Sequence, residues 1–326
     1  MSKPLPCAAM SSEVIGVLTS LKAGLLDPVL LETKFPGGIR GMSQTTEDSV
    51  PHSSQVLYEV SDKIGTITLN RPEKLNAMSR SLLDELEATF EYAKIDPNVK
   101  VVLLKGSGRS FCAGYDLAPD DWILSQYGAD FEGPVDAVQD REDVTEILEY
   151  WLRLWKFPKP IIAEVQGVCL SGAGELLAMA DIVVAAEDAK FGHPAGRDLG
   201  IPVTLSFWPI LIGMRKTKEL LFTAKLIDGI EAERIGLVNQ VVPSEELSSA
   251  AIAMASDVAR TAEVGLRVSK LATNRWFENM GLLASTYSTA DLDTFFHQSD
   301  SYVDFFKIVR EQGMHAALEQ RAKKFG

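Results

Sequence analysis

Two periods of hydrophobic and polar residues follow one another along the chain and predict alternating strands and helices. Residues 56–60 and 63–70 alternate with a period of two, which predicts a hairpin that ends at Arg71-Pro72. After it, apolar residues recur at helical spacing, at Leu82, Leu83, Leu86, Phe90 and Ala93. Ser79 lies just before this run and is a suitable N-cap, so the sequence predicts a helix that ends at Asp96-Pro97-Asn98.

Further strand and helix signals continue this pattern. Residues 101–104 and 161–165 are continuous apolar runs that predict strands buried on both faces, and a third strand is predicted at 181–186. A glycine-rich turn follows each of the first two runs. Beyond Gly200 the pattern is mostly helical. This order favours an α/β core followed by a helical C-terminal part.

Residues 1–52 differ from the rest, because a polar stretch rich in Ser, Thr and Gln precedes the first regular pattern. They predict a poorly ordered extension. We therefore divide the chain into this extension, a core at 53–250 with an acidic insert near 118–150, and a helical C-terminal region at 251–326.

The charge and the cysteine content of the chain disfavour nucleic-acid-binding, membrane-attached and disulfide-rich proteins. Lys and Arg number 32 against 45 Asp and Glu, a net charge of −13, so we expect no nucleic-acid partner and no membrane attachment. The three cysteines are far apart and form neither a disulfide framework nor a CxxC metal site, which favours a reducing compartment, the cytoplasm. Residues 120–149 hold ten acidic residues and one basic residue, or −9 of the −13. The simplest interpretation of this segment is a solvated helical insert.

The two glycine-rich turns, residues 106–114 and 167–174, are the best candidates for chemistry. Glycine lets backbone N–H groups point at a ligand, and such a nest binds an oxyanion. The second turn leads into a predicted helix, whose N-terminus favours negative charge and has Glu175 in its first turn. Neither turn has the P-loop or the G-x-G-x-x-G pattern. The chain contains only four histidines, which disfavours a Ser-His-Asp hydrolase. Taken singly, Gly172 and Gly174 are explained equally well by close helix packing.

At these residues, and in this order, the chain resembles the crotonase (enoyl-CoA hydratase/isomerase) superfamily. The matching segments are residues 64–72, 75–78, 111–117, 160–163, the second turn with Glu175, 180–182, 189–194 and 233–243. The resemblance implies a crotonase (ClpP-like) spiral of repeated ββα units with a helical C-terminal trimerisation region. It also implies an acyl-CoA thioester as substrate and a homotrimer or homohexamer as the assembly.

The resemblance assigns roles to the two turns. It implies that the amides of Ala113 and Gly172 hold the thioester oxygen and stabilise an enolate, and that Glu175 is an acid/base group. The implied substrate-binding residues are Ala113, Gly114, Tyr115, Asp116 and Gly172. Coenzyme A enters as part of the substrate, and no metal and no other cofactor is implied.

One position departs from the family pattern. Where the family has Phe-Gly-x-Pro-Glu, this chain has Phe191-Gly192-His193-Pro194-Ala195, so a second glutamate is absent. His193 and Asp198 are candidates for an auxiliary group, although a structural histidine and a surface ion pair are simpler explanations for them. Hydration of a 2-enoyl-CoA is the leading hypothesis. The alternatives are an isomerase or a β-oxoacyl-CoA hydrolase or lyase that uses Glu175 alone, and a non-catalytic CoA-binding subunit.

Two groups of residues around these turns have candidate roles in the same chemistry. Five aromatic residues flank or occupy the acidic segment and either pack in the core or form the wall of a bulky acyl pocket: Trp122, Tyr127, Phe131, Trp151 and Trp155. The nearest basic candidates for the CoA phosphates are Lys74, Arg80 and Arg109.

Overall fold

The computed structural model describes residues 54–117 and 135–325. The predictions for residues 1–52 and for Trp122, Tyr127 and Phe131 lie outside these ranges. None of the helices within them is long and apolar enough to cross a membrane.

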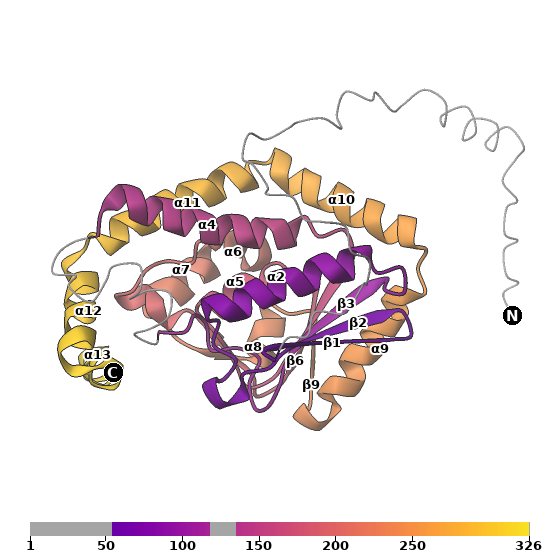
Figure 1. The fold of residues 1–326 in the computed structure, drawn as a ribbon, viewed down its shortest axis with the longest axis horizontal. Helices are drawn as coiled ribbons and strands as arrows, with labels where there is room; N and C mark the ends of the chain where they lie inside the picture. The colour runs from indigo at the N-terminus through magenta and orange to yellow at the C-terminus, as the bar shows by residue number, and fades with distance from the viewer. Residues whose placement is uncertain (1–53, 118–134, 326) are drawn as a thin grey trace, which may run out of the picture. The chain divides into compact units, whose positions relative to one another are not determined.

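A six-stranded sheet holds most of the described strands (Figure 1). The predicted hairpin is present as β1 (Val56–Ser61) and β2 (Ile64–Leu69), which pair antiparallel. The sheet continues with parallel strands in the order β3 (Val101–Gly106), β4 (Ile161–Val165), β6 (Ile182–Ala186) and β9 (Gln240–Val242). The apolar residues of β3 and β4 are buried, as their continuous runs predict for central strands of a parallel sheet.

A smaller sheet brings the two glycine-rich turns together. It consists of β5 (Val168–Leu170), β7 (Lys190–Gly192) and β8 (Ile227–Asp228). Cys112, in the first turn, forms a parallel bridge with Cys169 of β5. The amide of Cys112 donates to the carbonyl of Val168 at 3.0 Å, and the amide of Leu170 donates to the carbonyl of Cys112 at 3.3 Å. The backbone of one turn therefore lies against the start of the other.

Helices cover the large sheet. In α2 (Arg80–Ile95) the Leu82 amide donates to the Oγ of Ser79 at 3.1 Å, which confirms the predicted N-cap, and the five predicted apolar residues are buried. This helix packs on β1 and β2, whereas α9 (Leu247–Ala259) packs on β2, β3, β4 and β6. Four shorter helices connect the strands: α5 (Gly172–Leu177), α6 (Trp208–Ile212), α7 (Met214–Thr223) and α8 (Gly229–Arg234).

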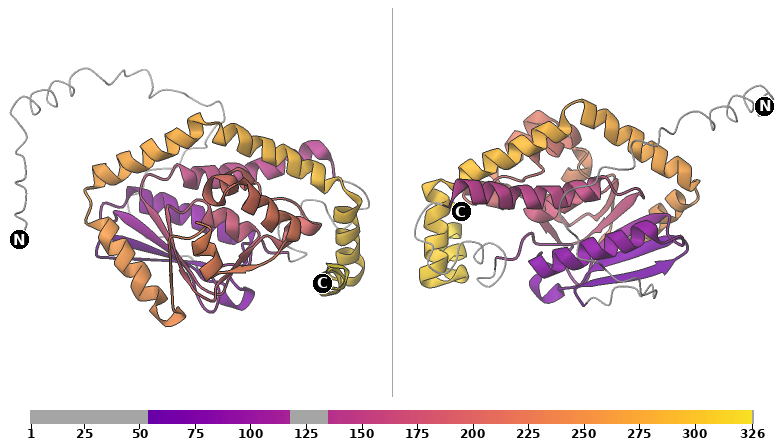
Figure 2. Two further views of the ribbon diagram at one scale, coloured as in Figure 1. Left: turned by 180° about the vertical axis from the view of Figure 1, so that it is seen from behind. Right: turned by 45° about the horizontal axis from the view of Figure 1, so that its top comes forward.

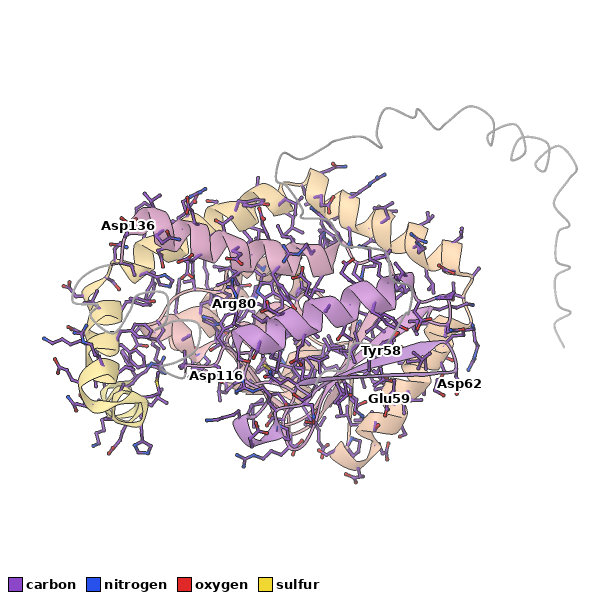
Figure 3. All side chains as sticks on the ribbon, in the orientation of Figure 1. Tyr58, Glu59, Asp62, Arg80, Asp116 and Asp136 are labelled. Atoms are coloured by element: carbon purple, nitrogen blue, oxygen red, sulfur yellow. The ribbon has the colours of Figure 1, made fainter. Side chains whose placement is uncertain are left out.

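The acidic segment differs from the solvated insert that its charge suggests. Its described part begins at the N-cap Asp136 (Figure 3) and forms α4 (Ala137–Trp155). Glu142, Glu146 and Glu149 are exposed on this helix, but Val144, Leu148 and Trp151 on its other face are buried. Because these apolar positions recur at helical spacing beneath the charges, α4 is a packed wall of the fold.

The C-terminal helices run along α4 and then turn across its end (Figures 1 and 2). After α10 (Glu263–Asn279), α11 (Leu282–His297) lies alongside α4, and α12 (Asp300–Gln312) packs against α13 (Met314–Phe325). The last two helices form a small apolar cluster of their own, made of Tyr302, Phe305, Phe306, Val309 and Ala317. Both of them reach the cavity described next.

Candidate active site

One cavity of about 280 Å³ collects residues from both glycine-rich turns. Its wall also includes residues of α4, α11, α12 and α13 and of the segment from residue 193 to residue 203. Glu175, the predicted acid/base group, lines it together with Ala113, Tyr115 and Gly172. The structure therefore brings the two predicted turns to one cavity, between elements that lie far apart in the sequence.

Asn76 holds the first turn in place. Its side-chain amide nitrogen lies 2.9, 2.8 and 3.1 Å from the carbonyl oxygens of Ser107, Ser110 and Phe111, and the residue is fully buried. An amide with several acceptors around it orders the carbonyls of a tight turn that have no partner in a regular strand. Asn76 lies in the matching segment 75–78, but its function as an anchor depends on contacts with residues more than 30 positions away and so is visible only in three dimensions.

Asp116 is held in a scaffold contact. Its carboxylate is paired with the guanidinium of Arg71 at 2.9 Å, and its amide donates to the carbonyl of Met78 at 3.0 Å. In Figure 3 Asp116 lies near the N-terminal end of α2, where Arg80 begins the helix. These contacts fix the backbone that follows Tyr115, and Asp116 does not line the cavity, so its substrate-binding role stays a prediction.

The amide of Ala113 is already engaged. It donates to the carbonyl of Leu75 at 3.0 Å, on the side of the turn away from β5. This contact differs from the prediction that Ala113 donates to the thioester oxygen. The backbone at Tyr115 is oriented differently. The Met78 amide donates to the carbonyl of Gly114, and the Asp116 amide donates to the carbonyl of Met78. Because Tyr115 lies between these two residues in a β-bridge with Met78, its own N–H points away from Met78.

The second turn comes very close to the first. A Cβ atom on Gly172 would lie 2.6 Å from the ring of Tyr115, and one on Gly114, whose φ is +104°, would lie 3.3 Å from the Gly172 nitrogen. Only glycine permits this approach of the two backbones. Gly172 is the first residue of α5, where N–H groups lack partners within the helix. The amides of Tyr115 and Gly172 are therefore neighbours at the edge of the cavity.

Glu175 is buried and accepts hydrogen bonds on both carboxylate oxygens. The Tyr115 hydroxyl donates to its Oε2, and so does the indole N–H of Trp151, at 2.9 Å. The amide of Val203 donates to its Oε1 at 3.1 Å. Burial and, to a smaller extent, the charge of Asp293 raise the pKa of Glu175 to about 7, against the effect of these three donors. A carboxyl that titrates near neutral pH can give or take a proton there.

Position 195, where the resemblance implies a glutamate, lies on the same cavity. Ala195 lines it, as does His193. Burial lowers the pKa of His193 to about 4, and its Nε2 lies 3.2 Å from the Gly200 carbonyl, so the ring is a neutral, buried side chain. Asp198 does not line the cavity: it pairs with Arg321 of α13 at 2.5 Å. Arg321 also donates to the carbonyl of Pro194, which fixes α13 to this segment.

The structure adds three residues that the sequence analysis does not single out. Asp293 and His297 of α11 and Asp140 of α4 line the cavity together with Glu175. Their spacing was available as a signal, because positions 293 and 297 lie on one face of a helix. The buried position of Asp140 could not be predicted in this way, because Asp140 belongs to a strongly acidic segment and such a charge pattern predicts exposure.

The remaining predicted residues fall outside the cavity. Trp155 packs edge-on against Phe207 with ring centroids 5.0 Å apart, whereas Trp151 touches Glu175. Arg80 is exposed and paired with Glu146 at 2.7 Å, and Lys74 and Arg109 are exposed. Within residues 54–117 and 135–325 no three His, Cys, Asp or Glu side chains form a group that could hold a metal ion.

Comparison with known proteins identifies relatives along nearly the whole described chain. The family model for enoyl-CoA hydratase/isomerase matches residues 59–326. The chain is 31% identical over 276 residues to the crotonyl-CoA hydratase of Syntrophomonas wolfei, covering 83% of this chain and 97% of that protein. It is 32% identical over 276 residues to the short-chain-enoyl-CoA hydratase of Clostridium acetobutylicum, covering 82% and 96%. The solved structure of an enoyl-CoA hydratase/isomerase from Xanthobacter autotrophicus Py2 superposes with a TM-score of 0.75 at 32% identity, over 84% of this chain and 99% of that one.

Proposed function

The chain belongs to the enoyl-CoA hydratase/isomerase family and has the crotonase fold, and we propose that it adds water to the C2=C3 double bond of a 2-enoyl-CoA. The observation that carries the proposal is Glu175, a buried carboxyl on the wall of a cavity that two backbone turns also border. Addition of water needs a proton for C2 and a site for the negative charge that develops on the thioester oxygen. These residues supply both.

We assign the thioester oxygen to the amides of Tyr115 and Gly172. The Ala113 amide is engaged by Leu75, whereas the Tyr115 amide points away from Met78 and borders Gly172. Two preorganised donors stabilise an enolate oxygen more strongly than a neutral carbonyl, and one such donor contributes about 3 to 4 kcal/mol to the transition state. The negative charge that develops on the thioester oxygen is therefore stabilised by two backbone amides.

Glu175 supplies the proton that C2 receives. Its Oε2 accepts from Tyr115 and Trp151, so in the protonated state the acid hydrogen resides on Oε1. Burial favours this protonated state up to about pH 7. After water has added to C3 and the enolate has formed, transfer of this proton to C2 completes a 3-hydroxyacyl-CoA.

The cavity favours a short acyl chain. About 280 Å³ is at the lower end of the range for binding sites, since pockets for drug-sized ligands occupy roughly 300 to 1,000 Å³. Tyr302 and Phe306 of α12 and Leu318 of α13 close the cavity with apolar surface. The names of the relatives from Syntrophomonas wolfei and Clostridium acetobutylicum, a crotonyl-CoA and a short-chain-enoyl-CoA hydratase, agree with this size. Crotonyl-CoA is therefore the first substrate to test.

The experiment follows the loss of enoyl thioester absorbance with crotonyl-CoA, for the wild type and for Glu175→Gln. Products formed in heavy-oxygen water and analysed by mass spectrometry distinguish hydration from isomerisation and from thioester hydrolysis. We expect one heavy oxygen in a 3-hydroxyacyl-CoA and loss of turnover in Glu175→Gln. Isomerised product without the label, or labelled free acid, would replace hydration by one of those reactions. Binding of CoA without any turnover would identify a non-catalytic subunit.

We also propose that the chain assembles as a trimer or a pair of trimers. Helix α10 and its C-cap expose a series of large apolar side chains: Val264, Val268, Leu271, Trp276 and the C-cap Met280. Contiguous exposed apolar residues are typical of interfaces between proteins. The mass of the purified protein, measured by light scattering, tests the assembly, and Val268→Lys is expected to weaken it.

A further inference from the structure

A second group of buried titratable side chains lies on the wall of the cavity. The Nδ1 of His297 lies 3.0 Å from both carboxylate oxygens of Asp140, and its Nε2 lies 3.6 Å from Oδ2 of Asp293. Asp140 is 0% exposed and Asp293 is 6% exposed. His297 thus connects two buried carboxylates, one from α4 and one from α11, and its ring stacks on Tyr302 at 4.4 Å.

The backbone beside Ala195 is shaped around this group. The amide of Ile201 donates to Oδ1 of Asp293 at 2.7 Å. A Cβ on Gly200, whose φ is +137°, would lie 2.7 Å from the same oxygen and 3.2 Å from Nε2 of His297. Residues 195–201 therefore pass the cavity with Ala195 on its wall and with a carboxylate from α11 seated against the backbone a few residues later.

A purely structural role for these three buried side chains would be unfavourable for the stability of the fold. Two carboxylates and one imidazole lose their hydration here, and apolar side chains of similar volume stabilise a core at least as well as a buried ion pair. Its electrostatic effect reaches Glu175, because the charge of Asp293 raises the pKa of Glu175. Asp293 therefore acts on Glu175 across the cavity that both residues line.

We propose that Asp293 is the second acid/base group of the site, and that His297 and Asp140 are positioning residues that hold it as a carboxylate. The proposal rests on the hydration function proposed above. It explains how the reaction proceeds with alanine at position 195: the missing carboxylate is supplied from α11 instead of from the segment after Pro194.

The roles of the two carboxyl groups follow from their partners. Asp293 accepts from the Ile201 amide and faces His297, which both favour its ionised form, whereas Glu175 carries the proton. Asp293 removes a proton from water, and the water oxygen forms its bond to C3. The π electrons of C2=C3 move onto the thioester oxygen, and when the enolate collapses its electron pair takes the proton of Glu175 at C2. The proton on Asp293 then passes to Glu175, so that both groups return to their starting states and one water molecule has been added.

The pH dependence involves every titratable group around Asp293. Burial raises the pKa of Asp293 to about 6, opposed by His297 and the Ile201 amide. Burial alone lowers the pKa of His297, but its hydrogen bond to Asp140 and the charges of Asp293 and Asp140 raise it overall. The other titratable groups of the wall are Tyr115, Asp143, Glu175, His193, Tyr302 and Arg321. We expect a bell-shaped profile of kcat, with apparent limits near pH 6 for Asp293 and near pH 7 for Glu175.

The test compares Asp293→Asn, Asp293→Glu and His297→Gln in the full chain, with crotonyl-CoA as the probe. Asp293→Asn is expected to lower kcat by roughly 100-fold or more with KM within about threefold, as expected for loss of a general base. Asp293→Glu keeps a carboxylate and should recover part of that loss. His297→Gln removes a neighbour that lowers the pKa of Asp293, so the acidic limb of the profile should move to higher pH. Asp291→Asn is the matched control, because Asp291 lies on the same helix and pairs with Arg141 on the surface.

The outcomes separate this inference from the function on which it rests. Wild-type hydration that is lost in Glu175→Gln but kept in Asp293→Asn overturns the role of Asp293 and leaves the hydratase function standing. A wild type that hydrates no enoyl-CoA overturns both. Equal losses in Asp293→Asn and Asp293→Glu, accompanied by lower thermal stability and an unmoved pH profile in His297→Gln, assign the group a structural role and overturn the proposal.

Discussion

The indole N–H of Trp151 donates to Oε2 of Glu175 at 2.9 Å, although the two residues lie on different helices and 24 positions apart. The same nitrogen lies 3.0 Å from the hydroxyl of Tyr115. Helix α4 and the residue that follows the first glycine-rich turn therefore both donate to the same oxygen of Glu175. This contact makes α4 part of the chemistry and allows the properties of Glu175 to be altered without replacing it.

Trp151→Phe is expected to raise the pKa of Glu175 above about 7, because the lost hydrogen bond favours the ionised form. The basic limb of the kcat profile should then move to higher pH, and the free energy of unfolding should fall by about 1 to 2 kcal/mol for a buried hydrogen bond. The control is Trp155→Phe, whose indole donates to Glu278 outside the cavity. An unmoved basic limb in Trp151→Phe would contradict the assignment of Glu175 as the acid.

Glu175→Gln is expected to be more stable than the wild type above pH 7 and similar to it at pH 4. The pKa of Glu175 rises from 4.5 to about 7 on folding, so its favourable contribution is complete below pH 4.5 and is lost as the pH rises through about 7. A neutral amide avoids the buried charge, and the difference at pH 8 approaches about 3 kcal/mol. Urea denaturation at both pH values measures it, and equal stability at pH 8 would rule out the burial penalty.

Asn76→Ala is expected to destabilise the first turn. The two hydrogens of the side-chain amide are shared among three carbonyls within hydrogen-bond distance, and leaving a buried acceptor unpaired costs about 1 to 3 kcal/mol. We expect a lower melting temperature together with a higher KM. Asn70→Ala is the control, since its side chain bonds to the Ser54 carbonyl on the surface. Similar melting temperatures for the two variants would show that Asn76 is not an anchor.

Gly172→Ala is expected to lower kcat/KM by about 100-fold, because the methyl group would lie 2.6 Å from the Tyr115 ring and displace an oxyanion donor. Gly265→Ala on α10 provides the comparison. Its nearest neighbour is 3.6 Å away, so this variant should keep its activity and gain up to about 1 kcal/mol of stability. Steady-state kinetics on both proteins tests whether catalysis depends on the close approach of the two turns, and an unchanged kcat/KM in Gly172→Ala would contradict it.

The sequence predicted the local features of the fold better than the details of the site. Ser79, the apolar face of α2 and the buried strands followed from short-range patterns that need no tertiary information. The Ala113 amide could not be assigned in this way, because its direction depends on a hydrogen bond to Leu75 across the turn. Asp140 was hidden for a different reason: charge predicts exposure, and only the packing of α4 against α11 shows that this carboxylate is buried.

The alanine at position 195 has a consequence for how such a site can change through evolution. A glutamate introduced there would add another carboxylate to a cavity wall that already includes Asp140, Asp143, Glu175 and Asp293, and we expect repulsion between these groups to weaken the folded state. Positions 195 and 293 are therefore coupled, and we expect a glutamate at position 195 to be tolerated better once Asp293 has been replaced by a neutral residue.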